Sequence, residues 1–268
     1  MPEILEAEAA RQALESGALG RRVETVHAPD AWFLKRGLTP EALTAALPAR
    51  KFTSARRRGK LLLLDTSGVG RSRTPGPVLA MHLGMSGRVI VDDAEAGDPL
   101  VYASNRDVPE WRRFGVTFAD GGEMWLRDPR RLGAVELDPD EDRLGPDAFE
   151  LSRAHLDAVL DRSGAPVKAL LMNQSKIAGL GNLLVDEVLW RAGIDPTRPA
   201  RSLDRDERKR LKRAIADSLR ILGRRGGSHT GDLTSVREPD AACPRDGAIL
   251  QRRTVGGRTT FSCPDHQC

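Results

Sequence analysis

The sequence predicts an α+β fold. An amino-terminal β-sandwich with a terminal helix is followed by a helical domain and a small carboxyl-terminal β-hairpin. Short strand-like runs separated by turn residues occupy residues 1–137. Apolar residues recur at helical spacing between residues 151 and 222. All three cysteines lie between residues 243 and 268. A chain of 268 residues can bury two modest hydrophobic cores.

The chain begins with a helix predicted over residues 3–16, because Leu5 and Ala9 share one face and Gly17 can end it. Strand-like runs follow at residues 22–27, 60–65, 78–83, 88–92, 114–118, 123–126 and 134–137. Asp120-Gly121-Gly122 predicts a hairpin turn between two of these runs. Short strands broken by such turns are typical of a sandwich.

Composition divides the chain into five segments. An acidic, proline-bearing stretch between the strand-rich and helical parts is typical of a linker. The predicted segments are a β-sandwich domain at residues 1–137, a linker at 138–150, a helical domain at 151–226, a loop at 227–242 and a hairpin module at 243–268.

The charge distribution indicates a partner that carries phosphates. Lysine and arginine total 42 residues against 38 acidic residues, a net charge of +4. Basic residues cluster at positions 56–58 and 127–131, whereas acids gather at 138–142. One basic face would attract phosphate groups. Residues 205–213 alternate basic with acidic side chains, so an ordinary solvated helix face is expected there.

The apolar runs and the cysteines bear on the compartment. The longest apolar run is too short to cross a bilayer, and no apolar signal stands at the amino terminus. We therefore expect a cytosolic protein without a membrane partner. Three cysteines in a reducing compartment favour a metal site over disulfides.

Residues 173–193 are the most informative segment. The pattern predicts a helix over residues 167–172, a turn containing Gly179 and Gly181, and a second helix that starts near Asn182. The glycines would let the backbone approach another molecule. With Asn182 as the cap, amide groups at the second helix would form a phosphate pocket. An ordinary helix–turn–helix packing unit is the alternative.

Several motifs in register resemble the formamidopyrimidine-DNA glycosylase and endonuclease VIII family. Residues 173–193 resemble its helix–two-turns–helix segment, and Met1-Pro2-Glu3 its amino terminus, although the usual proline at the fifth position is Leu5. Arg58-Gly59-Lys60 is similar to its lysine-bearing hairpin, and residues 82–87 and 128–133 to two further blocks. The resemblance implies a bacterial protein with a helix–two-turns–helix domain and a zinc-finger-like β-hairpin.

The resemblance also implies an activity. A member of this family is a bifunctional DNA glycosylase and abasic-site lyase of base excision repair, which removes oxidised bases through an amino-terminal proline Schiff base and cleaves the strand by elimination. Its partner would be double-stranded DNA with damaged bases or abasic sites. We expect a monomer in the bacterial cytoplasm, associated with the nucleoid. The alternative is a non-catalytic binder of damaged DNA or structured nucleic acid on the same scaffold.

Pro2 is the predicted nucleophile. Once Met1 is removed, its secondary amine can attack the sugar carbon that bears the damaged base and form an iminium. An α-amino group titrates below a lysine side chain, so more of it is neutral near pH 7. The positive end of the following helix favours the neutral amine, whereas Glu3 and Glu6 oppose this effect. Taken alone, Pro2 could be a first-turn helix proline.

Three other residues complete the predicted catalytic set. Glu3 would be the general acid on the sugar ring oxygen or the departing base. By resemblance, Lys60 contacts phosphate and assists strand cleavage, and Arg258 reaches the phosphate beside the lesion and assists the second elimination. Lys60 could instead be a sheet-edge lysine, and Arg258 a solvated turn arginine.

Met85, Arg130 and Leu132 lie where the family places the side chains that fill the gap left by an extruded base. An apolar wedge and a guanidinium suit unstacking of a duplex. The structural alternatives are a core methionine and a surface ion-pair arginine. With Lys60, Arg258 and Asn182, these residues make up the predicted DNA-binding set.

Two departures from the family bear on the lesion. Trp111 stands where enzymes that act on guanine lesions usually carry histidine, and the loop at 227–242 is shorter than the span that caps 8-oxoguanine. We therefore expect oxidised pyrimidines, ring-opened purines or abasic sites as substrates rather than 8-oxoguanine.

The carboxyl-terminal module resembles the family's zinc hairpin with substitutions. In place of four cysteines, Cys243 is followed after two residues by Asp246, and Cys263 after two residues by His266. All four are competent ligands for structural zinc. Cys268 could replace Asp246 or His266, and a zincless hairpin held by packing is the alternative.

Overall fold

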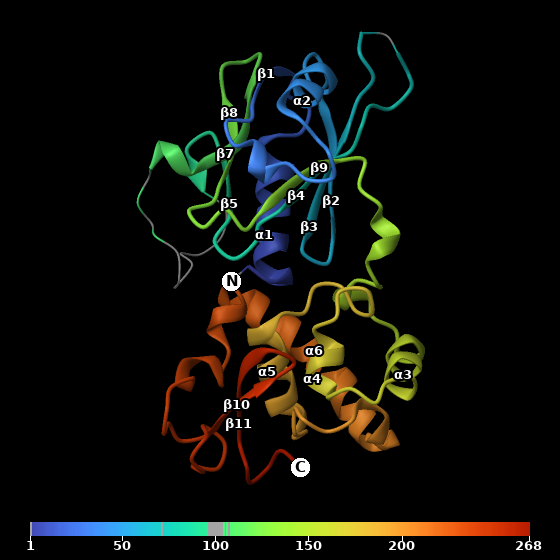
Figure 1. Ribbon diagram of the computed structural model, residues 1–268, viewed down its shortest axis with the longest axis vertical. Coiled ribbons are helices and arrows are strands. Elements are labelled where there is room, and N and C mark those ends of the chain that lie inside the picture. Colours follow the sequence, from blue (N-terminus) through green and yellow to red (C-terminus); the bar gives the residue numbers. More distant parts are fainter. Residues whose placement is uncertain (1, 71, 96–103, 105, 107) are drawn as a thin grey trace. The chain divides into compact units, whose positions relative to one another are not determined.

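The computed structural model describes the chain except residues 1, 71, 96–103, 105 and 107 (Figure 1). The chain divides into two compact units. Unit 1 comprises Met1–Pro2 and Glu6–Glu141, and unit 2 comprises Glu3–Leu5 and Asp142–Cys268. Unit 1 is rich in strands and unit 2 in helices, which confirms the predicted α+β class.

Unit 1 contains two antiparallel sheets (Figure 1). The five-stranded sheet has the order β1-β7-β8-β5-β6, and the four-stranded sheet has the order β2-β3-β4-β9. The strands are β1 (Val23–His27), β2 (Phe52–Arg58), β3 (Leu61–Thr66), β4 (Leu79–His82), β5 (Arg88–Val91), β6 (Ala94–Glu95), β7 (Arg112–Phe118), β8 (Glu123–Arg127) and β9 (Ala134–Leu137).

The two sheets share a core with helix α1 (Ile4–Gly17). Phe52 of β2 and Phe118 of β7 meet edge to face with ring centroids 6.2 Å apart, and Leu14 of α1 is buried in the same cluster. Leu62 and Leu64 of β3 also point into it. Alternating inward residues from two sheets are the basis of a sandwich core.

Several short elements of unit 1 escaped prediction. They are helix α2 (Pro40–Ala46), the 3₁₀ turns η1 (Ala31–Phe33) and η2 (Pro109–Trp111), and strands β2 and β6. Strand β2 carries three consecutive arginines, Arg56, Arg57 and Arg58, which hide its strand pattern. It forms because it pairs along the apolar strand β3.

Unit 2 is built on four helices, α3 (Arg153–Asp161), α4 (Val167–Leu171), α5 (Asn182–Ala192) and α6 (Arg205–Arg225). Short 3₁₀ turns, η3 (Glu141–Arg143), η4 (Ala148–Glu150) and η5 (Ala200–Ser202), lie before and between them. Helix α6 starts with a capping box made by Asp204 and Glu207 and ends at Gly226, which has φ 107°. Helices α4 and α5 pack in one apolar cluster, and both contribute buried leucines.

The carboxyl-terminal hairpin consists of β10 (Gln251–Val255) and β11 (Arg258–Ser262). Its turn residues Gly256 and Gly257 both have positive φ, 57° and 71°, as a two-residue type I′ turn requires. Phe261 packs with Trp190 of α5 in a separate small core.

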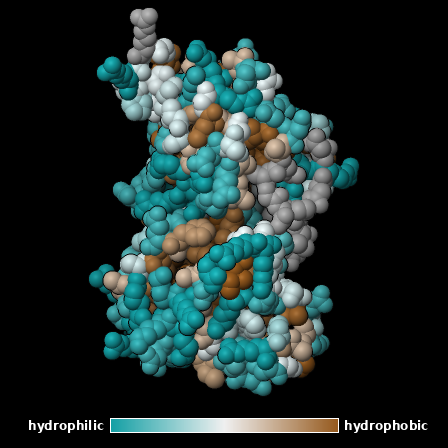
Figure 2. Space-filling view, turned by 180° about the vertical axis from the view of Figure 1, so that it is seen from behind, coloured by the Kyte–Doolittle hydropathy of each residue, from teal (hydrophilic) through white to brown (hydrophobic). Residues whose placement is uncertain are grey.

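The segment between α6 and the hairpin, predicted as a loop, carries the 3₁₀ turns η6 (Ser228–Thr230) and η7 (Thr234–Val236). Within the described residues, no helix has the length and apolar character needed to cross a membrane. Figure 2 shows one face of the molecule, on which hydrophilic residues predominate and hydrophobic residues form scattered patches.

Candidate active site

Glu3 lies at the start of helix α5. Pro2 is buried, and the Glu3 carboxylate has no exposed surface. Its oxygens accept hydrogen bonds from the backbone amides of Leu183 (2.8 Å) and Leu184 (3.2 Å). A carboxylate at a helix amino terminus satisfies amides that the helix itself cannot pair. Glu3, the residue beside Pro2, is therefore firmly held.

This arrangement corrects the prediction for the glycine turn. The helix cap is Gly181, not Asn182, and two of the amides expected to bind phosphate are occupied by Glu3. A Cβ on Gly181 would lie 2.3 Å from the Glu3 carboxyl carbon, and one on Gly179 would lie 2.5 Å from Ile4. The molecule that the glycines allow to approach is the amino terminus of the same chain.

Lys60 lies in the two-residue turn that joins β2 to β3. Its neighbour Gly59 has φ 60°, as the first position of a type II′ turn requires. Arg57 donates to the Gly59 carbonyl (2.8 Å) and to Glu8 of α1 (3.0 Å). The turn that carries Lys60 is thereby tied to α1.

Met85, Arg130 and Leu132 lie on two loops that are joined by a buried carboxylate. Asp128 accepts hydrogen bonds from the Ser86 hydroxyl (2.5 Å) and from the amides of Arg130 (3.1 Å), Leu132 (2.8 Å) and Gly133 (2.7 Å). The loops also touch at Gly84, where a Cβ would be 2.3 Å from the Leu132 carbonyl carbon.

The two loops expose the predicted wedge. Met85 is 37% exposed and Leu132 is 49% exposed, and the described part of the chain exposes few other large apolar side chains. A core position for Met85 is therefore wrong. Arg130 is exposed, and no ion pair of Arg130 occurs among the described residues.

Asn182 and Arg258 are brought close together within unit 2. Asn182 Nδ2 donates to the backbone carbonyl of Thr259 (3.0 Å), the residue after Arg258. Arg258 is the exposed first residue of β11. The amide of Asn182 retains a second N–H that can donate to a phosphate.

Two charged residues that were not predicted from the sequence lie next to the Asn182–Thr259 contact. Lys168 and Asp186 are buried and form an ion pair with an Nζ–Oδ1 distance of 2.6 Å. Burial lowers the pKa of Lys168 below its ordinary value, and Asp186 opposes this shift. The available signal was a charge on each apolar helix face, Lys168 in α4 and Asp186 in α5.

Cys243, Asp246, Cys263 and His266 converge at the base of the hairpin. One ligand atom from each of them lies within 4.8 Å of the others. His266 Nδ1 is 2.6 Å from Asp246 Oδ2, and Cys263 Sγ is 3.3 Å from the same carboxylate. The cluster could hold a metal ion. Cys268 is exposed and does not belong to it.

The surroundings of the cluster suit metal ligands. His266 Nε2 is 3.2 Å from the Trp190 carbonyl, and this contact favours the tautomer that leaves Nδ1 available as a ligand. Trp190 Nε1 donates to Cys243 Sγ (3.3 Å). Burial raises the pKa of the Cys263 thiol to about 11, a shift that a bound cation would oppose.

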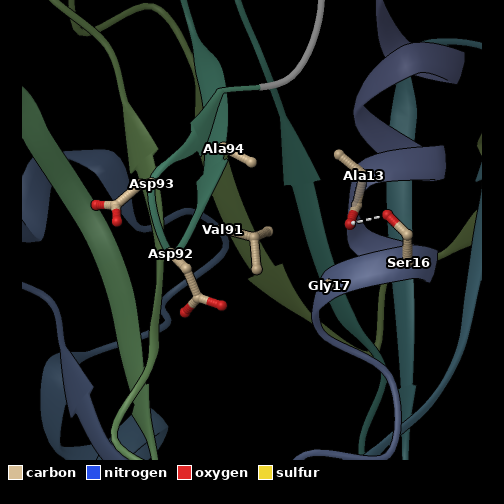
Figure 3. A pocket seen from close by; sticks show the side chains of 7 residues that line it. All are labelled: Ala13, Ser16, Gly17, Val91, Asp92, Asp93 and Ala94. Atoms are coloured by element: carbon tan, nitrogen blue, oxygen red, sulfur yellow. Dashed lines mark hydrogen bonds between the residues drawn. The ribbon is translucent and has the colours of Figure 1, made fainter.

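A separate hollow of about 550 Å³ in unit 1 contains none of these residues. Figure 3 shows its lining, with Gly17 at the end of α1 facing Val91 of β5 and with Asp92 and Asp93 on the turn that follows. Asp92 forms an ion pair with Arg21 (2.9 Å).

Two sequence models of known families match this chain. The formamidopyrimidine-DNA glycosylase N-terminal domain matches residues 1–135, and the H2TH domain of the same glycosylase matches residues 144–232. The chain belongs to the formamidopyrimidine-DNA glycosylase family.

Full-length relatives of the family agree with this assignment. The formamidopyrimidine-DNA glycosylase of Geobacter metallireducens is 32% identical and that of Bacillus cereus 30% identical, each with 98% of both chains covered. Lactococcus lactis Fpg in complex with DNA containing N7-benzyl-Fapy-dG has a TM-score of 0.82 at 25% identity, with 99% of both chains covered. The same protein with oxidised-pyrimidine DNA gives 0.81 at 26%, again with 99% covered.

The chain keeps its own features within the glycosylase family. Trp111 stacks with the Arg127 guanidinium, which lies 5.1 Å from the ring centroid. The cluster that could hold a metal ion contains Asp246 and His266, where the family's zinc hairpin has cysteines by resemblance. As a family member the chain is an enzyme, a DNA glycosylase of base excision repair, and no observation favours the alternative of a non-catalytic binder.

Proposed function

We propose that this DNA glycosylase and abasic-site lyase acts through the amine of Pro2 on double-stranded DNA that contains damaged bases or abasic sites. The observation that carries the proposal is the fixed position of Glu3, the next residue after Pro2 in the chain, whose carboxylate accepts hydrogen bonds from the Leu183 and Leu184 amides. A catalytic group held by its surroundings loses little freedom when the substrate binds.

The reaction follows from the amine. The Pro2 nitrogen forms a bond to the sugar C1′ as the bond from C1′ to the base breaks, and the base leaves with the electron pair. In its protonated form Glu3 donates a proton to the ring oxygen or to the departing base, and it takes up a proton from water again before the next turnover. The nitrogen loses its proton to water and forms a double bond to C1′ as the C1′–O4′ bond breaks and O4′ takes up a proton, which gives an iminium. Loss of a proton from C2′ then expels the 3′ phosphate, and a second elimination expels the 5′ phosphate.

Lys60 and Arg258 assist the eliminations by neutralising the phosphates that leave, and Asn182 grips a neighbouring phosphate. Tight turns support these roles, because they present Lys60 and Arg258 at the ends of two hairpins. Met85 and Leu132 enter the gap left by the extruded base, and Arg130 contacts the unpaired base on the opposite strand. Their exposure on loops fixed by Asp128 supports this role.

Reductive trapping tests the nucleophile. Borohydride should trap a covalent complex between the enzyme and DNA with an abasic site, because it reduces the iminium. Pro2→Gly should abolish or greatly weaken the adduct. The control is Arg252→Gln, an exposed residue of β10 outside the proposed catalytic set, which should trap like the unaltered enzyme. An adduct insensitive to Pro2→Gly would contradict the mechanism.

We propose oxidised pyrimidines, ring-opened purines and abasic sites as the preferred substrates. The short segment 227–242 supports this choice, because hydrogen bonds and an ion pair hold it against α5. The Asp232 and Leu233 amides donate to Glu187 (3.1 and 2.8 Å), and Asp232 pairs with Arg191 (2.6 Å). A panel of lesion duplexes tests the choice, and preferential release of 8-oxoguanine opposite cytosine would overturn it.

We propose structural zinc for the Cys243, Asp246, Cys263 and His266 cluster. The donor set and the orientation of His266 by the Trp190 carbonyl support zinc. When bound, the ion would cross-link the two ends of the hairpin module. We also propose that the enzyme works in the bacterial cytoplasm at the nucleoid, since the curated relatives are bacterial and its proposed substrate is DNA.

A further inference from the structure

We propose that Asp186 is a positioning residue for Arg258. Together with Lys168 and Arg237 it clamps β11 onto α5, and so holds the backbone next to Arg258 during the second elimination. The inference rests on the proposed role of Arg258 in that step.

The clamp begins with buried charges. Lys168 is fully buried, and Asp186 is 2% exposed. Asp186 Oδ1 accepts from Lys168 Nζ (2.6 Å), and Oδ2 accepts from the Arg237 guanidinium and from the Phe261 amide (3.3 Å). Burying an ion pair costs free energy unless its hydrogen-bonding capacity is used. Here Lys168 donates to the Thr260 hydroxyl and Asp186 accepts from the Phe261 amide, so the pair forms hydrogen bonds with the hairpin.

The donors of the clamp converge on one carbonyl. The Thr259 oxygen accepts from Lys168 Nζ (3.3 Å), Asn182 Nδ2 (3.0 Å) and Arg237 Nη2 (3.3 Å). These donors come from α4, from α5 and from the segment between α6 and the hairpin. Lys168 Nζ also donates to the Thr260 hydroxyl (2.7 Å).

The clamp lies one residue from the functional side chain. Arg258 is exposed and follows a turn of two glycines, Gly256 and Gly257, which supply no side chains of their own. An isolated two-stranded hairpin is only marginally stable in water. Anchoring the Thr259 carbonyl therefore restricts where the Arg258 backbone can go. A displacement of about 1 Å at a catalytic group can slow a reaction about 100-fold.

Arg237 gives the clamp a link to the short segment that distinguishes this chain. Its guanidinium stacks on the Phe261 ring of β11, 5.0 Å from the centroid, in addition to binding Asp186. The segment between α6 and the hairpin therefore contacts both α5 and β11. This gives the shortened segment a function: it supports the hairpin.

The test separates the two eliminations in single-turnover reactions on a duplex with one abasic site. Asp186→Asn keeps the side-chain shape but removes the charge. It should slow the second elimination at least 10-fold while borohydride trapping changes less than twofold. Arg258→Gln should likewise slow the second elimination and leave trapping nearly unchanged. Adding Asp186→Asn to Arg258→Gln should slow the second elimination no further.

A matched control and a milder variant keep the test decisive. Asp195→Asn breaks the partly exposed pair with Arg253 of β10 (3.1 Å) and should leave both steps unchanged. Arg237→Gln retains the Lys168–Asp186 pair. It should slow the second elimination less than Asp186→Asn does, again with trapping nearly unchanged. This variant covers the case in which Asp186→Asn fails to fold. Equal loss of trapping and elimination in Arg237→Gln, or no loss in folded Asp186→Asn, would overturn the inference.

Hydrogen exchange distinguishes failure of this inference from failure of the proposed function. Without DNA, Asp186→Asn or Arg237→Gln should speed amide exchange in residues 258–262 at least 10-fold and leave α6 unchanged. Unchanged exchange in β11 would overturn the clamp whatever the activity. If exchange rises but Arg258→Gln eliminates normally, the proposed role of Arg258 is wrong, and with it the inference that depends on that role.

Discussion

At the scale of single residues, Asp128 shows how one buried side chain can shape a surface that it does not form. Its carboxylate joins the Ser86 hydroxyl to the amides of Leu132 and Gly133. Hydrogen bonds to a buried charged group contribute more to stability than neutral ones. The exposure of Met85 and Leu132 follows from these bonds, because they determine where both loops turn.

Replacing Asp128 by alanine should therefore disable the predicted wedge. We expect Asp128→Ala to lower the free energy of unfolding by about 3 kcal/mol, because buried amides lose their acceptor. The rate of base extrusion should also decrease. A fluorescent base analogue opposite the lesion measures this rate. Ser86→Ala removes one donor to Asp128 and leaves the Arg130 amide its bond to Asp128, so it should cost about 1 kcal/mol. Normal extrusion by Asp128→Ala would show that the loops do not depend on the carboxylate.

At the scale of elements, each of two hairpins combines a glycine turn with an ionic anchor. The β2–β3 hairpin carries Lys60 in its turn, and the β10–β11 hairpin carries Arg258 just after its turn. Arg56 of β2 pairs with Asp65 of β3 (2.8 Å) and with Glu141 (3.0 Å). Tight turns fix the register, and the charge pairs fix the strands behind them.

The Asp65 pair predicts a pH dependence of stability. Arg56 foremost, with Ser54, lowers the pKa of Asp65 below its unfolded value of about 4. Its contribution is therefore fully present above the unfolded pKa and is lost as the pH falls through the folded pKa. Asp65→Asn should cost about 1 kcal/mol at pH 7, a small effect because Arg56 is partly exposed.

The measurement is urea unfolding of both proteins at pH 7, 5 and 3. The difference between them should be equal at pH 7 and 5 and smaller at pH 3. A difference that stays constant or grows at pH 3 would mean that the carboxylate charge is not what stabilises the hairpin.

We expect the hairpin module to bind one zinc ion per chain, because it contains one cluster of four proposed ligands. His266→Ala removes a proposed ligand, so it should lower the zinc content and the thermal midpoint, because binding to the folded state stabilises it. Elemental analysis and thermal unfolding measure both quantities. Cys268→Ser should keep full zinc content, since that thiol is exposed and outside the cluster. Zinc-free unaltered protein would refute the site.

At the scale of the whole molecule, the sequence predicts apolar strands bounded by turns well and charge arrangements between distant segments poorly. Strands such as β3 and β9 were predicted within one residue, because their apolar runs are bounded by turns. The resemblance to the family's zinc hairpin implied the four residues of the candidate metal site, and the structure brings them together.

Other features depend on residues far apart in the chain. The amides of Leu183 and Leu184 were expected to bind phosphate, because nothing near them in the sequence shows that Glu3 occupies them. The Lys168–Asp186–Arg237 cluster joins three distant segments, so no local spacing reveals it. Strand β2 was not predicted, because its consecutive arginines hide the strand pattern and pairing with β3 stabilises it.

The central claim is that the amine of Pro2 forms the covalent intermediate. The most direct measurement is mass spectrometry of peptides from the borohydride-trapped complex, after digestion of both protein and DNA. We expect the sugar remnant on an amino-terminal peptide that begins at Pro2, with Met1 absent. A remnant on Lys60, or an amino-terminal peptide that retains Met1 in the trapped complex, would contradict the account.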